Sequence, residues 1–422
     1  LHSMNLIESN IDLQLLNPKD VTLVVPVWSS PRGHELMFPI SFVYIRTKDT
    51  DFILNFQHID ANSVSQFPIE KLCNENTLVL GNRYIQSKGL DYEWVYFEEY
   101  GKPFIFNEFA ESLYKGYRND YTEMNDCIPL MKWYELLKAI PDIQNRRSWY
   151  RTYSDSIKIL GRLEGAGVKV EEEKFIDSFS FNPAFIDAGK VYTQYNPYTT
   201  TGRPSNRHLN VNYSALNKSD GTRSAFVSRF EDGTLLQFDY ESYHIRLIAK
   251  LIGYEFPKGV TAHQHLADLY GCDYETAKKV TFTYLYGGLD DSARTIPFFI
   301  EVDKYIKGLY QKFVISGRLT TPLYKREIHF SKIEGATEQK VFNYLLQALE
   351  TEINYMKIGK VLDWLECKKS KMVLYTYDAF LIDTHPNERD EILKSVTTIM
   401  EEGGFPVRAE EGKNYDDLSV ID

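Results

Sequence analysis

The chain has 422 residues, 43% of them hydrophobic, and a formal net charge of -11. This length and apolar content predict two or three globular domains, each with its own core. No apolar run approaches the roughly 20 residues that span a bilayer, and no charged start precedes an apolar leader, so we expect a cytoplasmic protein without membrane contact. Leu1, His2 and Ser3 precede Met4 and are interpreted as a cloning remnant.

The cysteine and charge patterns narrow the class further. Four cysteines without close pairs predict neither a zinc site nor a disulfide framework, which fits a reducing cytosol. The acidic balance disfavours nucleic-acid binding without excluding it, because affinity for phosphates depends on the local density of lysine and arginine. Basic residues gather at four places: Arg203 and Arg207, Lys278-Lys279, Lys325-Arg326, and Lys368-Lys369 with Lys371.

The first part of the chain, residues 4-145, is predicted to be a small α/β domain. Short runs rich in β-branched and aromatic residues precede two helical patterns. These runs and patterns are Val21 to Val25, Ile40 to Ile45, Phe52 to Phe56, Phe109 to Tyr117 and Ile128 to Leu137. The polar, proline-containing stretch from Ile140 to Arg147 indicates the domain boundary.

Residues 146-422 are predicted to form a second, mixed α/β domain that begins with a helix from Tyr153 to Ala166. A loop-rich segment, 194-212, then leads to a strand from Thr234 to Asp239, and a strand-turn-strand pattern surrounds Asp378. Further helices are expected at Tyr243 to Ile252, His263 to Tyr270, Tyr274 to Tyr286, Lys340 to Leu365 and Asn387 to Glu402.

Asp239 stands at the end of the apolar run from Leu235 to Phe238, and Asp378 lies inside the run from Val373 to Ile382. Carboxylates at strand ends can share two divalent cations, of which one activates a 3'-hydroxyl and the other stabilises departing pyrophosphate. Hard oxygen ligands predict Mg²⁺, with Mn²⁺ as a substitute. Each aspartate alone is more commonly a turn or cap residue. The two together, on either side of the helix described next, favour a nucleotidyl-transfer site.

Lys278, Phe282 and Tyr286 are spaced at i, i+4 and i+8 and therefore share one face of a helix. A lysine on this face can neutralise negative charge on a leaving pyrophosphate, and Phe282 can stack on a nucleobase. An ordinary amphipathic helix with a solvated lysine would show the same spacing.

In this order the segments resemble the three motifs of the family A DNA polymerases, the group of bacterial polymerase I and many phage replicative polymerases. Asp239-Tyr240 followed by Arg246 resembles motif A, Lys278 to Gly287 resembles motif B, and Tyr377-Asp378 resembles motif C. The resemblance covers roughly residues 154-422. It implies a palm with fingers at about residues 243-330, and it makes Asp239, Asp378 and the Tyr240 backbone the metal ligands.

The resemblance implies further contacts with substrates. Thr201-Gly202-Arg203 is similar to an element whose arginine contacts the minor groove of a primer-template, and Asn343 and Gln347 keep the spacing of another template-contacting pair. His263 corresponds to a histidine near the nucleotide phosphates. Lys325 and Arg326 lie near a basic segment of the same region, which predicts further DNA contacts.

The departures from the family pattern are specific. His244 stands where a glutamate usually excludes a ribose 2'-hydroxyl, which puts discrimination between deoxyribonucleotides and ribonucleotides in doubt. Tyr377 and Ala379 flank the motif C aspartate in place of a histidine and a second carboxylate. Tyr274 replaces a phosphate-binding arginine one turn before Lys278, and the segment that usually holds the helical thumb is much shorter here.

The amino-terminal domain occupies the position of the family's 3'-5' exonuclease. Its one Asp-x-Glu triplet, Asp91-Tyr92-Glu93, lies well after the early strands. We therefore expect a degenerate exonuclease-like fold without proofreading, and an unrelated interaction domain is the alternative.

The sequence predicts a template-directed DNA polymerase that extends a primer with dNTPs. We expect it to be phage-encoded and to act in the bacterial cytoplasm, with a processivity or replisome partner protein replacing the thumb. Two alternatives stay open. One is a catalytically weak or inactive polymerase fold that binds nucleic acid or a replisome protein, and the other is a polymerase that accepts ribonucleotides because of His244.

Overall fold

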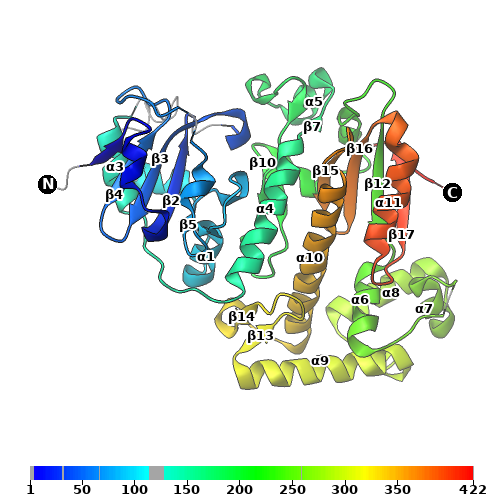
Figure 1. The fold of residues 1–422 in the computed structure, drawn as a ribbon. Helices are drawn as coiled ribbons and strands as arrows, with labels where there is room; N and C mark the ends of the chain where they lie inside the picture. Colours follow the sequence, from blue (N-terminus) through cyan, green and yellow to red (C-terminus); the bar gives the residue numbers. More distant parts are fainter. Residues whose placement is uncertain (1–3, 31–32, 66, 114–127, 258, 422) are drawn as a thin grey trace. The chain divides into compact units, whose positions relative to one another are not determined.

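A computed structural model describes residues 4-30, 33-65, 67-113, 128-257 and 259-421 (Figure 1). The chain divides into two compact units. The first unit comprises residues 1-167, 179-198 and 207-211, and the second comprises residues 168-178, 199-206 and 212-422. Helices and strands occur in both units, so the predicted mixed α/β class is confirmed.

A six-stranded sheet forms the centre of the first unit, in the order β1-β4-β3-β2-β5-β6. Its strands are β1 (Asn5–Ile7), β2 (Val21–Trp28), β3 (Ile40–Thr47), β4 (Asp51–Asn55), β5 (Leu78–Val79) and β6 (Leu90–Asp91). The three middle strands β2, β3 and β4 pair antiparallel, whereas β5 and β6 continue from β2 in parallel. The three predicted β-rich runs are thus confirmed as adjacent strands.

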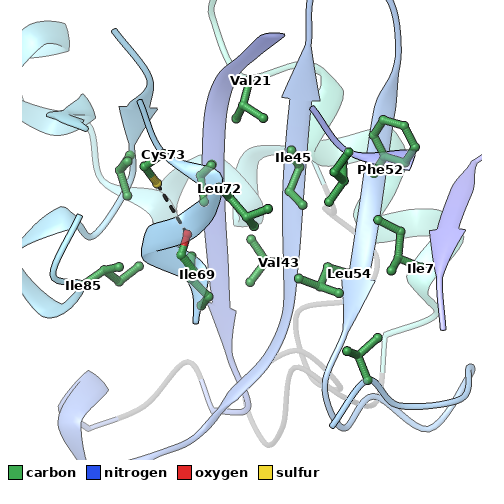
Figure 2. Packing of buried hydrophobic residues seen from close by; sticks show 14 residues of the cluster. Ile7, Val21, Val43, Ile45, Phe52, Leu54, Ile69, Leu72, Cys73 and Ile85 are labelled. Carbon is green, nitrogen blue, oxygen red and sulfur yellow. Dashed lines mark hydrogen bonds between the residues drawn. The ribbon is translucent and has the colours of Figure 1, made fainter. Parts of the chain in front are cut away.

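Side-chain alternation along β3 assigns its two faces to different layers. Val43 and Ile45 point into a buried apolar cluster that includes Ile69 and Leu72 (Figure 2). Phe42, on the opposite face, packs against Trp133, with 5.8 Å between ring centroids.

Helices of the first unit agree with the predicted patterns where they are described. Trp133 belongs to α3 (Leu130–Lys138), which confirms the helix predicted from Ile128 to Leu137. The helix predicted from Phe109 corresponds to α2 (Phe106–Leu113), and the rest of that prediction lies outside the described residues. Helix α1 (Tyr92–Tyr100) was not anticipated.

The first unit extends past the boundary predicted at residues 145 and 146, because α4 (Tyr150–Ala166) packs onto it. Tyr153 on α4 stacks on Trp94, with ring centroids 4.7 Å apart. Gly161 lies so close to the backbone of Arg83 that an added Cβ would be 1.9 Å from the Arg83 carbonyl oxygen. The polar stretch at 140-147 is therefore a connection within the first unit.

The sheet of the second unit is antiparallel throughout, in the order β15-β16-β12-β17-β18. Its strands are β12 (Thr234–Tyr240), β15 (Lys371–Thr376), β16 (Ala379–Thr384), β17 (Val407–Gly412) and β18 (Ser419–Val420). Helix α11 (Arg389–Glu401) contacts β12 and β17, and the long helix α10 (Glu338–Trp364) contacts β15.

Helices predicted for this unit are confirmed with small shifts at their ends. The segment after β12 forms α6 (Tyr243–Ile252), α7 (Ala262–Tyr270) and α8 (Tyr274–Gly287). Helix α9 (Pro297–Ser316), which lies in the predicted fingers but was not anticipated as a helix, leads to the hairpin of β13 (Arg318–Thr320) and β14 (Glu327–His329).

The segment between α4 and the Thr-Gly-Arg element is short, as the sequence indicates. It contains one α-helix, α5 (Glu172–Phe179), so no helical thumb is built from residues 168-200, all of which are described.

The remaining short strands are β7 (Val168–Lys169), β8 (Lys190–Val191), β9 (Tyr195–Asn196), β10 (Ser205–His208) and β11 (Val211–Asn212). Within the described ranges, no helix is both long and apolar enough to cross a bilayer.

Gly161→Ala should destabilise the first unit by about 1–3 kcal/mol or more, because the new methyl group overlaps the Arg83 carbonyl. The control is Gly165→Ala on the same helix, where the nearest atom to an added Cβ is 3.8 Å away. That change should stabilise α4 by about 0.5–1 kcal/mol. Urea denaturation of both variants measures the difference. Equal stability of the two variants would contradict the close contact.

Candidate active site

Pairing between β12 and β16 brings Asp239 and Asp378 to the same end of the sheet. Asp239 is directly opposite Ala379, the residue after Asp378, and the Tyr240 amide donates to the Asp378 carbonyl at 3.4 Å. Residues opposite one another in antiparallel strands have Cβ atoms about 5 Å apart. Both aspartates line a cavity of about 360 Å³. The two carboxylates, distant in sequence, thus belong to one site.

The turn that carries Asp378 is held by a buried amide. Tyr377 has a φ of +56°, a conformation that costs energy for a residue with a side chain. Asn354 lies on α10 and is fully buried. Its Nδ2 donates to the Tyr377 carbonyl at 2.6 Å and to the Tyr375 hydroxyl at 3.1 Å. Tyr243 donates to the Asn354 Oδ1 at 3.2 Å. The turn geometry is therefore fixed from the helix beneath it.

The electrostatics of the aspartates favour a bound cation. Burial raises the pKa of Asp239 to about 7, with the Asp378 carboxylate as the second cause. Burial likewise raises the pKa of Asp378, and the carboxylate of Glu350 adds to the shift. The Oδ1 atom of Asp239 is buried and forms no hydrogen bond. A divalent cation would relieve the repulsion and bind that oxygen.

The residues present fit Mg²⁺ in the way that substrate-binding sites usually hold it. In the part of the chain that the structure describes, no group of three or more His, Cys, Asp or Glu side chains is placed to enclose a metal. Mg²⁺ commonly binds through one or two carboxylates and keeps water and substrate phosphates as its other ligands. Asp239, Asp378 and the Tyr240 carbonyl would hold the ions, which would supply charge neutralisation and activation of a hydroxyl.

Helix α8 contributes the opposite wall of the cavity. Lys278, Phe282 and Tyr286 all line it, as their spacing predicts. The rings of Phe282 and Tyr286 lie nearly parallel with centroids 5.8 Å apart, and both are partly exposed. His263 on α7 also lines the cavity, and burial lowers its pKa to about 4, so its imidazole is neutral at pH 7.

Glu350, a buried carboxylate that the sequence analysis did not assign to the site, contacts two other residues that line the cavity. Glu350 on α10 is only 2% exposed, and its Oε2 accepts from His244 at 3.0 Å and faces the Arg203 Nε at 3.3 Å. The other ring nitrogen of His244 forms a short hydrogen bond with the Tyr286 hydroxyl. Arg203 also stacks on Tyr377, 3.9 Å from the ring centroid. His244 is therefore held between a carboxylate and a phenol.

Five predicted DNA-contacting residues do not line this cavity. Arg246 interacts with Glu241 instead. Gln347 accepts from Thr201 at 3.5 Å and so lies near the Thr-Gly-Arg element. Asn343, one turn earlier on the same face of α10, is half-buried.

The two basic residues in the loop after α9, Lys325 and Arg326, have different environments. Lys325 is exposed, with its ammonium on the Pro322 carbonyl. Arg326 is fully buried and donates to the Thr199 carbonyl at 3.3 Å, so its guanidinium is not exposed at the surface. Sequence alone did not separate the two, because both are basic residues in one loop.

Several residues that sequence reasoning did not assign to the site line the cavity. They are Glu241, Ser242, Tyr243, Ile245, Thr281, Leu285, Glu350 and Arg408. Glu350 could have been noticed, since it follows Gln347 by three residues on a predicted helix. Arg408 could not, because only strand register brings it opposite Asp239.

The chain is similar to known DNA polymerases over much of its length. No protein-family model matches the chain. DNA polymerase I of Lactococcus lactis subsp. lactis is 24% identical over 329 residues, covering 65% of this chain and 37% of that protein. DNA polymerase I of Streptococcus pneumoniae serotype 4 is 22% identical over 428 residues, covering 90% of this chain and 45% of that protein. The chain thus spans less than half the length of these curated relatives.

A solved structure has the same fold. The POL domain of Pol1 from M. smegmatis, in complex with DNA primer-template and dNTP, superposes with a TM-score of 0.66 at 12% sequence identity, covering 98% of this chain and 99% of that one. The fold is therefore that of a polymerase POL domain. Together with the curated relatives, this confirms the resemblance to the family A DNA polymerases.

Without divalent cations, ionisation of Asp239 should destabilise the folded protein. A carboxyl whose pKa rises from 3.8 to about 7 on folding contributes most stability below pH 4 and loses that contribution as the pH rises through 7. The melting temperature of Asp239→Asn, relative to wild type, should therefore increase between pH 4 and 8 in EDTA. Thermal denaturation across this range measures the difference.

Addition of Mg²⁺ should then stabilise wild type but not Asp239→Asn at pH 8. Asp416→Asn, at an exposed position, is the control and should behave as wild type. Equal responses of all three proteins to pH and to Mg²⁺ would contradict the assignment of Asp239.

Proposed function

We propose that the chain is a template-directed DNA polymerase that extends a primer 3'-hydroxyl with deoxynucleoside triphosphates. The observation that carries this proposal is the convergence of Asp239 and Asp378 opposite the Lys278 face of α8, in one cavity. Distant kinship to DNA polymerase I and the POL-domain fold support it. The net charge of -11 does not exclude this activity, because affinity for phosphates depends on the local density of lysine and arginine.

Each residue of the site has its own role in the proposed reaction. Asp239 and Asp378 would hold the cations, which would activate the hydroxyl and neutralise the charge of the pyrophosphate. Lys278 faces the leaving pyrophosphate and lowers its charge. The parallel rings of Phe282 and Tyr286 present an aromatic surface on which a nucleobase can stack. His244, fixed by Glu350 and Tyr286, borders the place where the sugar would lie.

We further propose that the first unit has lost proofreading. Strand β2 carries no aspartate or glutamate. The carboxylates of the Asp-x-Glu triplet serve the fold: Asp91 accepts from the Trp94 amide at 2.8 Å, and Glu93 accepts from the Gly81 amide at 3.1 Å. Both carboxylates are therefore engaged by backbone amides of the first unit.

Asp378→Asn should abolish primer extension. Loss of groups that only orient a metal ligand costs about 10–100-fold, so loss of a direct ligand should exceed that range. Extension of a labelled primer on a template, with dNTPs or rNTPs and with Mg²⁺ or Mn²⁺, measures the rate. The control is Asp390→Asn, because Asp390 is exposed. Asp383→Asn is unsuitable as a control because Asp383 is buried in an ion pair.

The outcomes separate the candidate functions. Incorporation of dNTPs by wild type and by Asp390→Asn, but not by Asp378→Asn, supports the proposal. Incorporation of rNTPs at a comparable rate would favour the alternative that the chain is a polymerase that accepts ribonucleotides. Template binding without any incorporation would favour a binding protein. Without nucleotides, a mismatched primer should keep its length if proofreading is absent.

The short segment in place of a thumb should make extension distributive. With no helical thumb in residues 168-200, little surface remains to enclose a duplex. Extension in the presence of excess unlabelled trap DNA should yield only a few added nucleotides per binding event, and a partner protein would lengthen the products. Long products from the chain alone would contradict this expectation.

A further inference from the structure

Arg408 on β17 faces the same cavity as the catalytic aspartates. It stands directly opposite Asp239 in the β12–β17 register, and paired residues of antiparallel strands share one face. Its side chain is 54% exposed and forms an ion pair with Glu410 at 2.9 Å. Gln237 donates to the other oxygen of Glu410 at 3.0 Å and thereby fixes this carboxylate. Arg408 is thus a positioned but accessible cation.

A triphosphate needs several cations, and few lining this cavity are available. Arg203 is engaged by Glu350 and by the Tyr377 ring. His263 is neutral because burial lowers its pKa. Among the described residues that line the cavity, Lys278 and Arg408 are the remaining lysine and arginine. They approach from opposite walls, Lys278 from α8 and Arg408 from the sheet.

Tyr274 marks the place where positive charge is missing from α8. It precedes Lys278 by four residues and so lies on the same helical face, where it lines the cavity without contributing a cation. Burial raises the pKa of Tyr274 and the charge of Arg408 opposes this rise, and both side chains line the same cavity. Arg408 also acts on Asp239, whose pKa it lowers against the effect of burial.

Building on the proposed polymerase function, we propose that Arg408 binds the terminal phosphates of the incoming nucleoside triphosphate from the sheet side. The planar guanidinium can donate two parallel hydrogen bonds to phosphate oxygens. Arg408 then supplies from β17 the charge that Tyr274 does not supply from α8. It is a nucleotide-binding residue and takes no part in bond making.

The test compares Arg408→Ala with Arg408→Lys and with the double variant Arg408→Ala/Tyr274→Arg. Loss of a charge-assisted hydrogen bond should raise KM for dATP about tenfold in Arg408→Ala, with a smaller change in kcat. Tyr274→Arg should recover most of the loss, since it returns a cation to the same phosphates. Arg408→Lys should fall between the two.

A matched control is Arg318→Ala, which removes an equally exposed arginine (51%) from an ion pair with Glu327. It should leave KM unchanged. Melting temperatures of all variants should stay within a few degrees of wild type, because exposed ion pairs contribute little stability.

Direct binding distinguishes this proposal from the polymerase proposal. Calorimetric titration with dATP and with dAMP, in Ca²⁺ without primer, should show about tenfold weaker dATP binding by Arg408→Ala and unchanged dAMP binding. If wild type fails to extend primers but shows this difference, the polymerase proposal fails while the phosphate contact stands. The role of Arg408 would be overturned if Arg408→Ala left dATP binding and KM unchanged. A loss confined to kcat, or an equal weakening of dAMP binding, would overturn it as well.

Discussion

The constraint on which the site depends is the placement of two carboxylates in a half-buried position where neither can ionise easily alone. Burial and mutual repulsion both oppose charge on Asp239. Such an arrangement raises the free energy of the metal-free protein, and it persists because the β12–β16 register and the Asn354 contacts hold the turn. The same features favour a divalent cation, which replaces repulsion with attraction.

The second wall of the site follows from this constraint. Cations held by the two aspartates would attract phosphates, and the aromatic and basic face of α8 lies across the cavity from them. Glu350 joins the two walls, because it holds both His244 and Arg203 while its charge acts on Asp378. In this chain His244 is therefore supported from α10, a helix that the motif comparison connected only with DNA.

Much of this could be predicted from the sequence because the signals are local. Helix α6 has the predicted bounds, since an apolar stripe and a following glycine define it, and the strand around Asp239 follows from a short apolar run. Features that depend on tertiary contacts were missed. The extent of the first unit reflects Gly161 packing on Arg83, and the burial of Arg326 reflects its bond to Thr199. Arg408 enters the site through strand register alone.

The central claim is that Asp239 and Asp378 share divalent cations opposite α8. X-ray diffraction from crystals grown with a primer-template, a non-reactive nucleoside triphosphate and Mn²⁺ tests it most directly. The account predicts anomalous density for two ions at coordination distance from both carboxylates, with the triphosphate between them and Lys278. A nucleotide bound in the cavity with no ion on either aspartate, or ions held by other residues, would contradict it.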